Sequence, residues 1–339
     1  MHTLWNSVAE TLAQEQRVVL CSIVNSSGSA PRTSGARMLA WPDGRIHGSV
    51  GGGPVEGATL ARARQMLEAG ETHAMLSFNL APSTAAEAGM VCGGAVQVLA
   101  RLLVPDQQEI FATLADLYAQ RVRVALVTVL DAENTMHTGL WSEETGLLGL
   151  SLPADLTVEL QRKARKARQN FQLSHDKNTV FVEPLVAPTR VYLVGAGHVA
   201  LATARVAAWA GFEVVVMDDR AEFASEERYP KAREVRVLEN FENCLTDLSP
   251  GDFVVIVTRG HVHDRDVLAQ ALRTKAQYVG MIGSVSKRDA VYGSLLENGY
   301  TQADLERVFC PIGLAIGADT PEEIAISIVA EMINVRAGQ

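Results

Sequence analysis

Two rhythms of apolar and polar residues divide the chain. Up to about residue 187, apolar runs of strand length are mixed with helical segments and with loops rich in glycine, proline and serine. From Arg190 onwards, strand-like and helix-like segments alternate regularly. Regular alternation is typical of a parallel sheet with helices on both faces. The pattern therefore predicts an α+β domain over residues 1–187 and an α/β domain over residues 188–339, with the boundary in "VAPTR" (186–190).

The first domain is expected to contain short helices, hairpins and glycine-rich loops. Its predicted helices are 3–16, a segment from the glycines at 51–53 to Gly70, 106–120 and the basic run "QRKARKARQ" at 161–169; its predicted strands are 17–24, 36–41, 45–50, 73–80, 95–103, 121–130, 137–142 and 179–185. The spacing of the basic run suits a solvated helix face, with an anion-contacting face as the alternative. Strands 17–24 and 121–130 are loosely alike, but two such strands do not establish a repeat.

The second domain reads as alternating strands and helices. Its predicted strands are 190–195, 213–218, 235–238, 252–258, 277–283 and 307–310, and its predicted helices are 198–210, 264–274, 286–298 and 320–336. The last helix has a strong start signal, because Thr320, Pro321 and Glu323 supply an N-cap, an N1 proline and an N3 glutamate.

Charge and cysteine usage narrow the possible partners. The formal net charge is −9, which disfavours nucleic acid and anionic membranes, since both attract clustered Lys and Arg. The four cysteines show no CxxC pairing, and no charged-then-apolar segment opens the chain. No apolar run approaches the roughly 20 residues needed to span a bilayer. A cytoplasmic protein without a disulfide framework is expected.

The stretch "VYLVGAGHVA" (191–200) predicts a phosphate-binding turn between a strand and a helix. Gly195 permits the tight turn, Gly197 lets a phosphate approach the backbone, and the small Ala200 allows close packing. The helix N-terminus then offers free N–H groups to an anion. The next strand ends in Asp218 and Asp219, where an acid normally accepts ribose hydroxyls and favours an NAD-like ligand. These features predict a Rossmann-like domain.

The ends of the other parallel strands are expected around the same ligand. The candidates there are His198, Thr258, Arg259, Gly260, His261, Gly283 and Ser284. His261, His263 and Asp264 have a spacing that could suggest a metal, but phosphate contacts, a helix cap by Asp264 or general polarity are favoured. His198 is expected to face either the ligand or the solvent, and Gly283 and Ser284 form either a second anion-binding turn or an ordinary loop.

The loop "GSVGGGPVEG" (48–57) is unusually dense in glycine, which is entropically costly to order. Gly51, Gly52 and Gly53 favour close approach of the backbone to a ligand. Glu56 is a candidate hydrogen-bonding group for a base or a pterin-like ring, with a helix-terminus charge as the alternative. In "MVCGG" (90–94), Cys92 stands beside two glycines whose amides could stabilise a thiolate, so it is a candidate for sulfur handling or metal contact. Buried small hydrophobes are the default for Cys21 and Cys244.

Together these segments resemble the xanthine dehydrogenase accessory factor family (XdhC/CoxI). The matching stretches are "GSAPRTSGARML", "GSVGGGPVEG", "GMVCGG", "VGAGHVA", "DDRAEFASEERYP", "TRGHVHDRDVL", "YVGMIGSVSKR" and "PIGLAIGADTPEEIAISIVAEM". The resemblance implies a cytoplasmic, commonly dimeric factor that binds molybdenum cofactor (molybdopterin in mono- or dinucleotide form). It also implies help in sulfuration by a cysteine desulfurase and delivery to a molybdenum hydroxylase apoenzyme. Such a protein is a cofactor-binding chaperone rather than a catalyst.

Departures from the family pattern concern two loops. Pro54 follows the glycine triplet where CoxI-like members often have cysteine. Phe309, Cys310 and Ala315 stand in the loop where the family tends to read "HAPIGLDIGA", so its usual histidine and aspartate are missing, although Asp319 lies nearby.

Two other classes of function share the glycine fingerprint. An NAD-dependent oxidoreductase would need an acid/base constellation, and no Ser with a Tyr-x-x-x-Lys set occurs. A nucleotide sensor that gates a partner would leave the glycine-rich loops of the first domain unexplained. The leading hypothesis places the cofactor's phosphate on residues 195–200 and brings the loops around Gly51–Gly53 and Cys92 to the same crevice, within one chain or across a dimer.

Overall fold

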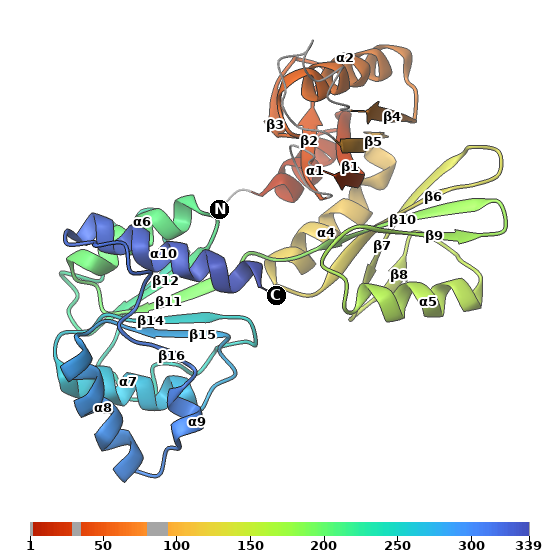
Figure 1. Cartoon of the computed structure of the whole chain (residues 1–339). Helices are drawn as coiled ribbons and strands as arrows, with labels where there is room; N and C mark the ends of the chain where they lie inside the picture. The colour runs from red at the N-terminus through yellow and green to blue at the C-terminus, as the bar shows by residue number, and fades with distance from the viewer. Residues whose placement is uncertain (1–2, 29–34, 80–93, 339) are drawn as a thin grey trace. The chain divides into compact units, whose positions relative to one another are not determined.

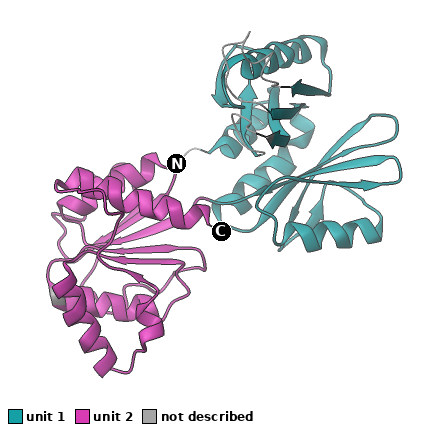
Figure 2. Ribbon diagram, in the orientation of Figure 1, with its two compact units in different colours: residues 1–187 teal, residues 188–339 magenta. Residues whose placement is uncertain are grey.

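The computed structural model describes residues 3–28, 35–79 and 94–338. Two compact units, Met1–Ala187 and Pro188–Gln339, make up the chain (Figure 2). Unit 1 contains two five-stranded antiparallel sheets, and unit 2 contains one six-stranded parallel sheet. This confirms the predicted α+β half followed by a Rossmann-like half.

The first sheet of unit 1 has the strand order β3-β2-β1-β5-β4 (Figure 1). Its elements are α1 (Leu4–Ala13), β1 (Val18–Gly28), β2 (Arg37–Ala40), β3 (Ile46–Gly48), α2 (Gly53–Ala69), β4 (His73–Asn79) and β5 (Gly94–Leu103). The second sheet has the order β8-β7-β6-β10-β9. Its elements are η1 (Pro105–Gln107), α4 (Gln108–Ala119), β6 (Val124–Leu130), β7 (Met136–Ser142), β8 (Gly146–Leu148), α5 (Ala154–Ala164), β9 (Phe171–His175) and β10 (Asn178–Leu185).

These two halves of unit 1 are a structural repeat, which we call copy 1 (residues 4–103) and copy 2 (residues 108–185). Each runs helix, three-stranded meander, helix and hairpin, and each sheet places its strands in the same order. The turn after the first helix is also the same: Glu15 and Arg121 have φ values of 58° and 64°. The similarity of strands 17–24 and 121–130, which did not establish a repeat by itself, therefore reflects equivalent strands, β1 and β6.

Strand registers define which residues of the two copies are equivalent. Leu20 pairs with Arg101 in copy 1, and Leu126 pairs with Glu183 in copy 2, so Arg101 and Glu183 are equivalent. Arg37 pairs with Ser22 of β1, and Thr138 pairs with Thr128 of β6. Because Ser22 and Thr128 are equivalent, Arg37 and Thr138 are equivalent as well.

The copies pack together through equivalent apolar positions. One core cluster contains four such pairs and the helices α1 and α4: Val18 with Val124, Leu20 with Leu126, Leu39 with Leu140, and Leu103 with Leu185. A smaller cluster contains two more pairs: Val24 with Leu130, and Leu99 with Phe181. Contacts between like positions are the signature of an isologous pair. The outer faces of the two sheets are covered separately by α2 and α5.

A buried ion pair sits between these apolar layers. Arg101 and Glu183 are both shielded from solvent and form a salt bridge. Arg101 also donates to the hydroxyls of Thr128, at 2.8 Å, and Ser22, which are themselves equivalent residues. Arg37 also reaches this pair, since its Nε donates to Glu183 Oε2 at 3.2 Å.

Unit 2 is a doubly wound sheet with the strand order β13-β12-β11-β14-β15-β16. Its elements are β11 (Arg190–Val194), α6 (His198–Trp209), β12 (Glu213–Asp218), β13 (Glu234–Val237), β14 (Phe253–Ile256), α7 (His261–Leu272), β15 (Tyr278–Met281), α8 (Val285–Glu297), α9 (Gln302–Leu305), β16 (Val308–Phe309) and α10 (Pro321–Ala337). Helices α6 and α10 cover one face and α7 and α8 the other (Figure 1). The predicted cap of the last helix is confirmed: the Thr320 side chain accepts from the Glu323 N–H.

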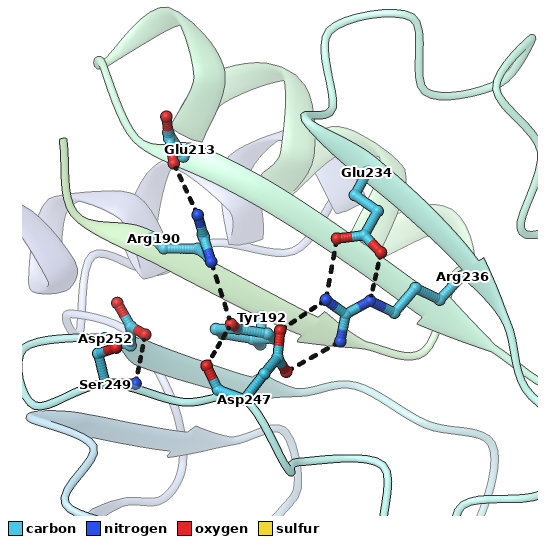
Figure 3. Close-up of polar contacts among 8 residues, drawn as sticks. All are labelled: Arg190, Tyr192, Glu213, Glu234, Arg236, Asp247, Ser249 and Asp252. Atoms are coloured by element: carbon cyan, nitrogen blue, oxygen red, sulfur yellow. Dashed lines mark hydrogen bonds and ion pairs between the residues drawn. The ribbon is translucent and has the colours of Figure 1, made fainter. Parts of the chain in front are cut away.

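The amino ends of the strands in unit 2 carry a network of ion pairs (Figure 3). The glycine turn lies at the opposite, carboxyl edge of the sheet, after β11. Arg236 binds Glu234 and Asp247, with its closest contacts at 2.7 Å to each. Arg190 contacts Glu213 at 3.4 Å. These contacts hold β11, β12, β13 and the loop before β14 in register, so this edge is a structural support.

The remaining differences from the predicted elements are local. The prediction of one helix over the basic run at 161–169 is wrong. Helix α5 ends at Ala164, and residues 166–169 are not helical. The short elements β8, β9 and α9 were not predicted. Helix α7 begins at His261, three residues before the expected start. None of the helices in the described residues is long and apolar enough to cross a membrane.

Candidate functional site

The glycine turn lies at the carboxyl end of β11. Gly195 has a φ of 109°, and its N–H donates to the Met217 carbonyl at 2.7 Å. A Cβ on Gly195 would come within 2.3 Å of the Val257 carbonyl oxygen, so glycine is required between the neighbouring strands. The protein itself therefore fixes the shape of this turn through β12 and the segment after β14.

Helix α6 opens directly from the turn. Its N-cap residue is Gly197, which has no side chain that could cap the helix. A Cβ added to Gly197 would have no atom of the described residues within 4 Å. Ala200 lies on the buried face of α6, as close packing requires, and His198 is exposed. An anion can thus reach the first N–H groups of α6, where the helix dipole favours negative charge.

The middle residue of the turn, Ala196, is held from both sides. Its N–H donates to Asp218 Oδ2 at 2.7 Å, and its carbonyl accepts from the Tyr229 hydroxyl at 2.9 Å. Burial raises the pKa of Tyr229 to about 12, so this hydroxyl stays protonated and remains a donor. Sequence reasoning missed Tyr229, because its role depends on a partner far away in the chain.

Asp218 is committed to the protein. It is 1% exposed, and it accepts from the Arg220 side chain at 2.8 and 3.0 Å in addition to Ala196. Burial acts to raise the pKa of Asp218, but the hydrogen bonds from Arg220 and Ala196 outweigh it and hold the pKa below its usual value. Both oxygens of the expected ribose acceptor therefore already have partners.

The neighbouring Asp219 has an unfilled acceptor. Its Oδ2 accepts from Arg259 at 2.7 Å. Its Oδ1 is buried and has no hydrogen-bond donor within the described part of the chain; the Arg220 Nε lies 3.9 Å away. A buried carboxylate oxygen without a donor is costly, so a ligand hydroxyl or N–H would be stabilised here.

The segment after β14 leads into α7, which contributes a second buried acid, Asp264. The Thr258 hydroxyl donates to Asp264 Oδ1 at 2.6 Å, and Lys287 forms an ion pair with Asp264 Oδ2. Asp264 is fully buried in the first turn of α7. The expectation that it caps this helix is wrong, because the N-cap residue is Gly260, whose φ is 94°.

Gly283 and Ser284 position the lysine. A Cβ on Gly283 would lie 2.8 Å from Lys287 Cδ, so glycine makes room for that side chain. Ser284 is the N-cap of α8 and accepts from the Lys287 N–H at 3.2 Å. These contacts favour the ordinary-loop interpretation over a second open anion turn.

The histidines after β14 have separate surroundings. His263 packs on Phe241 with ring centroids 4.9 Å apart. His261 begins α7, and its side chain lies outside the described residues. Across the described ranges, no group of three or more His, Cys, Asp or Glu side chains is placed to hold a metal ion.

Three cations at the carboxyl edge each have an acidic partner. Arg220 pairs with Asp218, Arg259 with Asp219 and Lys287 with Asp264. Because these three charges are balanced within the protein, the backbone N–H groups at the start of α6 remain as donors for an anion. The arrangement is suited to holding a phosphate-bearing ligand.

The glycine loop of unit 1 adopts an unusual backbone. Gly51, Gly52 and Gly53 have φ values of 120°, 72° and 59°. Glu56 accepts from the Ser49 hydroxyl and from the Gly52 N–H. Of the two roles considered for Glu56, these contacts favour the helix-terminus charge, because it stabilises its own loop. Cys92 lies outside the described residues; Cys21 and Cys244 are buried as expected.

The fold and the turn define a protein with a Rossmann domain that follows a duplicated α+β unit. The model described as "XdhC Rossmann domain" matches residues 191–332, and the model of the "XdhC and CoxI family" matches residues 11–79. Together they match more than half of the chain in the expected order. The chain belongs to the XdhC and CoxI family, which confirms the resemblance found in its motifs.

Curated relatives match over nearly the whole chain. A probable xanthine dehydrogenase subunit from Bacillus subtilis (strain 168) is 28% identical over 342 residues, covering 99% of this chain and 97% of that protein. The "Molybdenum cofactor insertion chaperone PaoD" of Escherichia coli (strain K12) is 23% identical over 337 residues, covering 99% and 89%. The crystal structure of a xanthine dehydrogenase from Bacillus halodurans is similar with a TM-score of 0.80, 24% identity and coverage of 98% and 96%. At that identity the structure supports the fold alone.

Proposed function

We propose that this protein is an accessory factor that binds molybdenum cofactor and delivers it to a molybdenum hydroxylase. The observation that carries the proposal is the combination, in unit 2, of an open helix start at Gly197 with the unfilled Oδ1 of Asp219. The cofactor is a pterin that carries a phosphate, so it has both an anion for the helix start and hydrogen-bond donors for the carboxylate. The end-to-end similarity to an insertion chaperone supports the same role.

In this proposal the protein binds and orients its cargo. The N–H groups at the start of α6 hold the phosphate oxygens. Asp219 accepts from an N–H or hydroxyl of the cargo, while Asp218 and Tyr229 keep the turn in shape. Delivery to the apoenzyme, sulfuration with a cysteine desulfurase, a homodimeric state and the choice between mono- and dinucleotide cargo are further parts of the same proposal.

Retention of the cofactor tests the proposal. The purified protein is mixed with molybdenum cofactor, and co-elution is measured by molybdenum content and pterin fluorescence. We expect both signals to elute with the protein. Loss of both signals, together with micromolar binding of NAD and substrate-dependent formation of NADH, would instead support the oxidoreductase alternative.

Two glycine variants separate binding from folding. Gly197→Val should fold, since its φ is −71° and space is open around it, but its side chain should block the phosphate and abolish retention. Gly195→Ala is the matched control for damage to the turn, because its Cβ would meet the β14 segment. It should lower the melting temperature strongly, whereas Gly197→Val should not. Full retention by Gly197→Val would exclude the helix start as the binding site.

Cys92→Ser tests the predicted sulfur-handling role of that residue. Retention and delivery of the cofactor should persist, while transfer of sulfur to the bound cofactor should fall. Unchanged sulfur transfer would remove Cys92 from the proposal.

A further inference from the structure

Unit 1 contains a cavity of about 450 Å³ that is lined mostly by residues of copy 1 and by Tyr118 of copy 2. Its lining residues are Leu4, Trp5, Gly35, Ala36, Arg37, Gly48, Ser49 and Tyr118. The volume lies within the range of sites for small organic ligands. The lining combines two aromatic side chains with a guanidinium and a hydroxyl.

Arg37 is the unusual member of this lining. Its Nε donates to Glu183 at 3.2 Å and its Nη1 to the Gly35 carbonyl at 2.9 Å. Its Nη2 is buried and has no acceptor among the residues that the structure describes. The guanidinium lies over the Trp5 ring, 5.4 Å from the centroid. A guanidinium donor without an acceptor is costly in a buried setting, so an anionic oxygen at this position would be stabilised.

The duplication shows that the positive charge of Arg37 is surplus. Arg101 and Glu183 already neutralise each other between the copies. Arg37 adds a second arginine to the same glutamate, and its equivalent in copy 2 is the uncharged Thr138. Burial, and then the positive charge of Arg101, lower the pKa of Arg37 against the opposing effect of Glu183, but an arginine remains protonated in proteins. The scaffold is thus complete without Arg37, and one positive charge remains without its own counter-ion.

The cavity is also joined to the glycine loop. The Ser49 hydroxyl accepts from the Gly51 N–H at 3.0 Å and donates to Glu56. A ligand that contacts Ser49 therefore touches the network that holds the glycine triplet in place.

We propose that this cavity binds a small organic anion, whose phosphate or carboxylate oxygens accept hydrogen bonds from Arg37 and whose body lies against Trp5. The inference does not rest on the proposed function, since it uses only contacts within unit 1. A pterin phosphate belongs to this class of ligand, and so do many other small organic anions.

Calorimetric titration of the full chain tests the proposal. Gly197→Val serves as the parent, so that the helix start of unit 2 does not contribute. The probes are AMP, benzoate and inorganic phosphate, each at the same ionic strength. We expect one site per chain for AMP and for benzoate, with at least one of them binding more tightly than inorganic phosphate. Absence of binding by both organic probes overturns the proposal, and equal affinity for all three overturns the assignment to an organic anion.

Arginine variants in the same parent locate the site. Arg37→Met should weaken the binding of the organic probe about tenfold or more, as expected for the loss of a charge-assisted hydrogen bond. Arg45→Met is the matched control, because Arg45 also lies over a tryptophan, Trp41, at 5.2 Å but outside this cavity. It should change the affinity less than twofold. An Arg37→Met chain that binds as tightly as the parent overturns the proposal.

A second variant covers the case in which Arg37→Met does not fold, as judged by circular dichroism. Arg37→Lys keeps the charge but lacks the planar fork of donors, so binding should be several-fold weaker while the fold is kept. Unchanged affinity in Arg37→Lys would overturn the role of the guanidinium. Because retention of molybdenum cofactor is measured separately, failure here is distinguishable from failure of the proposed function.

Discussion

The two copies in unit 1 differ in the loop before their second helix, where the shared fold does not require a particular sequence. Both begin the helix after the meander, yet copy 1 does so with three glycines at positive φ and copy 2 with Leu152, Pro153 and Ala154. The Pro153 backbone has a φ of −52°. Since copy 2 starts the same helix without glycine, the triplet is not needed to build the fold. Its entropic cost is consistent with the ligand contact that we propose for it.

The equivalent residues Arg37 and Thr138 also differ between the copies, in this case in charge. Both lie on the strand next to the central one, and each has a buried polar atom without a partner in the described residues. At this position copy 1 has an ionic group that lines a cavity, whereas copy 2 has an uncharged hydroxyl. Copy 2 is therefore an internal reference: features common to both copies serve the scaffold, and features confined to copy 1 are candidates for binding.

The largest effect is expected from breaking the contact that joins the copies. Arg101→Met leaves Glu183 buried with its main counter-ion removed, which should cost about 3–5 kcal/mol of unfolding free energy. The measurement is chemical denaturation of the full chain, following the transition of unit 1. The triple variant Arg37→Thr/Arg101→Met/Glu183→Leu removes all three charges of the cluster, so it is the control and should recover most of the loss. A single variant as stable as the parent would show that the ion pair does not join the copies.

The same contact predicts a response to acid. Burial acts to raise the pKa of Glu183, but Arg101 and Arg37 outweigh it and hold the pKa below its usual value. Because the folded-state pKa is depressed, this stabilisation is present above the unfolded-state value of about 4.3 and is lost as the pH falls through the folded-state pKa. Unfolding titrations at decreasing pH should show a smaller acid sensitivity in the triple variant than in the parent.

The glycine triplet gives an intermediate effect that sharpens the comparison. Gly52→Ala has open space around its Cβ but a φ of 72°, so it should cost about 1 kcal/mol in stability. Ala154→Gly, at the first residue of α5, should cost a similar amount, roughly 0.5–1 kcal/mol. Cofactor retention should fall in Gly52→Ala and stay unchanged in Ala154→Gly. Equal retention in both variants would mean that the triplet has no binding role.

Removing the orphan hydroxyl of copy 2 should have a small effect in the opposite direction. Thr138 is 7% exposed and its Oγ1 lacks a partner within the described ranges. Thr138→Val keeps the shape and removes the unsatisfied group, so stability should rise by up to about 1 kcal/mol. Thermal unfolding measures this change, with Thr128→Val as the control, since it removes a hydroxyl that Arg101 uses and should be destabilising.

The smallest effect is expected at the exposed ion pairs of unit 2. Arg236→Met removes the contacts to Glu234 and Asp247 that are drawn in Figure 3. Both carboxylates are partly open to solvent. Such pairs contribute about 0–1 kcal/mol, less than the buried pair of unit 1. Hydrogen bonds from Arg236 lower the pKa of Asp247, so any stabilisation is present above the ordinary aspartate pKa and is lost at lower pH. A loss in Arg236→Met as large as that in Arg101→Met would contradict the distinction between buried and exposed pairs.

Local pattern predicted most of the fold because the central strands are unbroken apolar runs. The turn residues Gly195, Gly197 and Ala200 were also predictable, since their roles depend on backbone geometry near the helix start. The repeat was not, because the copies share little sequence outside β1 and β6 and use different residues at the loop before the second helix. Short, half-polar strands such as β9 (Phe171–His175) give too little periodicity to identify.

The sequence also did not predict which groups the charged side chains would bind. Asp218 was placed at the correct strand end, but its pairing with Arg220 and Ala196 leaves Asp219 as the acceptor with an unfilled oxygen. Which side chains meet across a fold depends on packing rather than on local spacing. A signal was nevertheless present for Arg101 and Glu183, since each is a charged residue flanked by apolar residues within a strand, and such residues need a buried partner.

The opposite charges of Arg101 and Glu183 also determine which halves can associate. Two identical copies meeting through this contact would place arginine against arginine, or glutamate against glutamate, in a dry interface, which is unfavourable by several kcal/mol. Neither half of unit 1 is therefore complementary to itself, and each is complementary to the other. Unit 1 therefore resembles a heterodimer whose two halves are joined in one chain. In such an arrangement copy 1 can acquire residues for a ligand, while copy 2 maintains the shared scaffold.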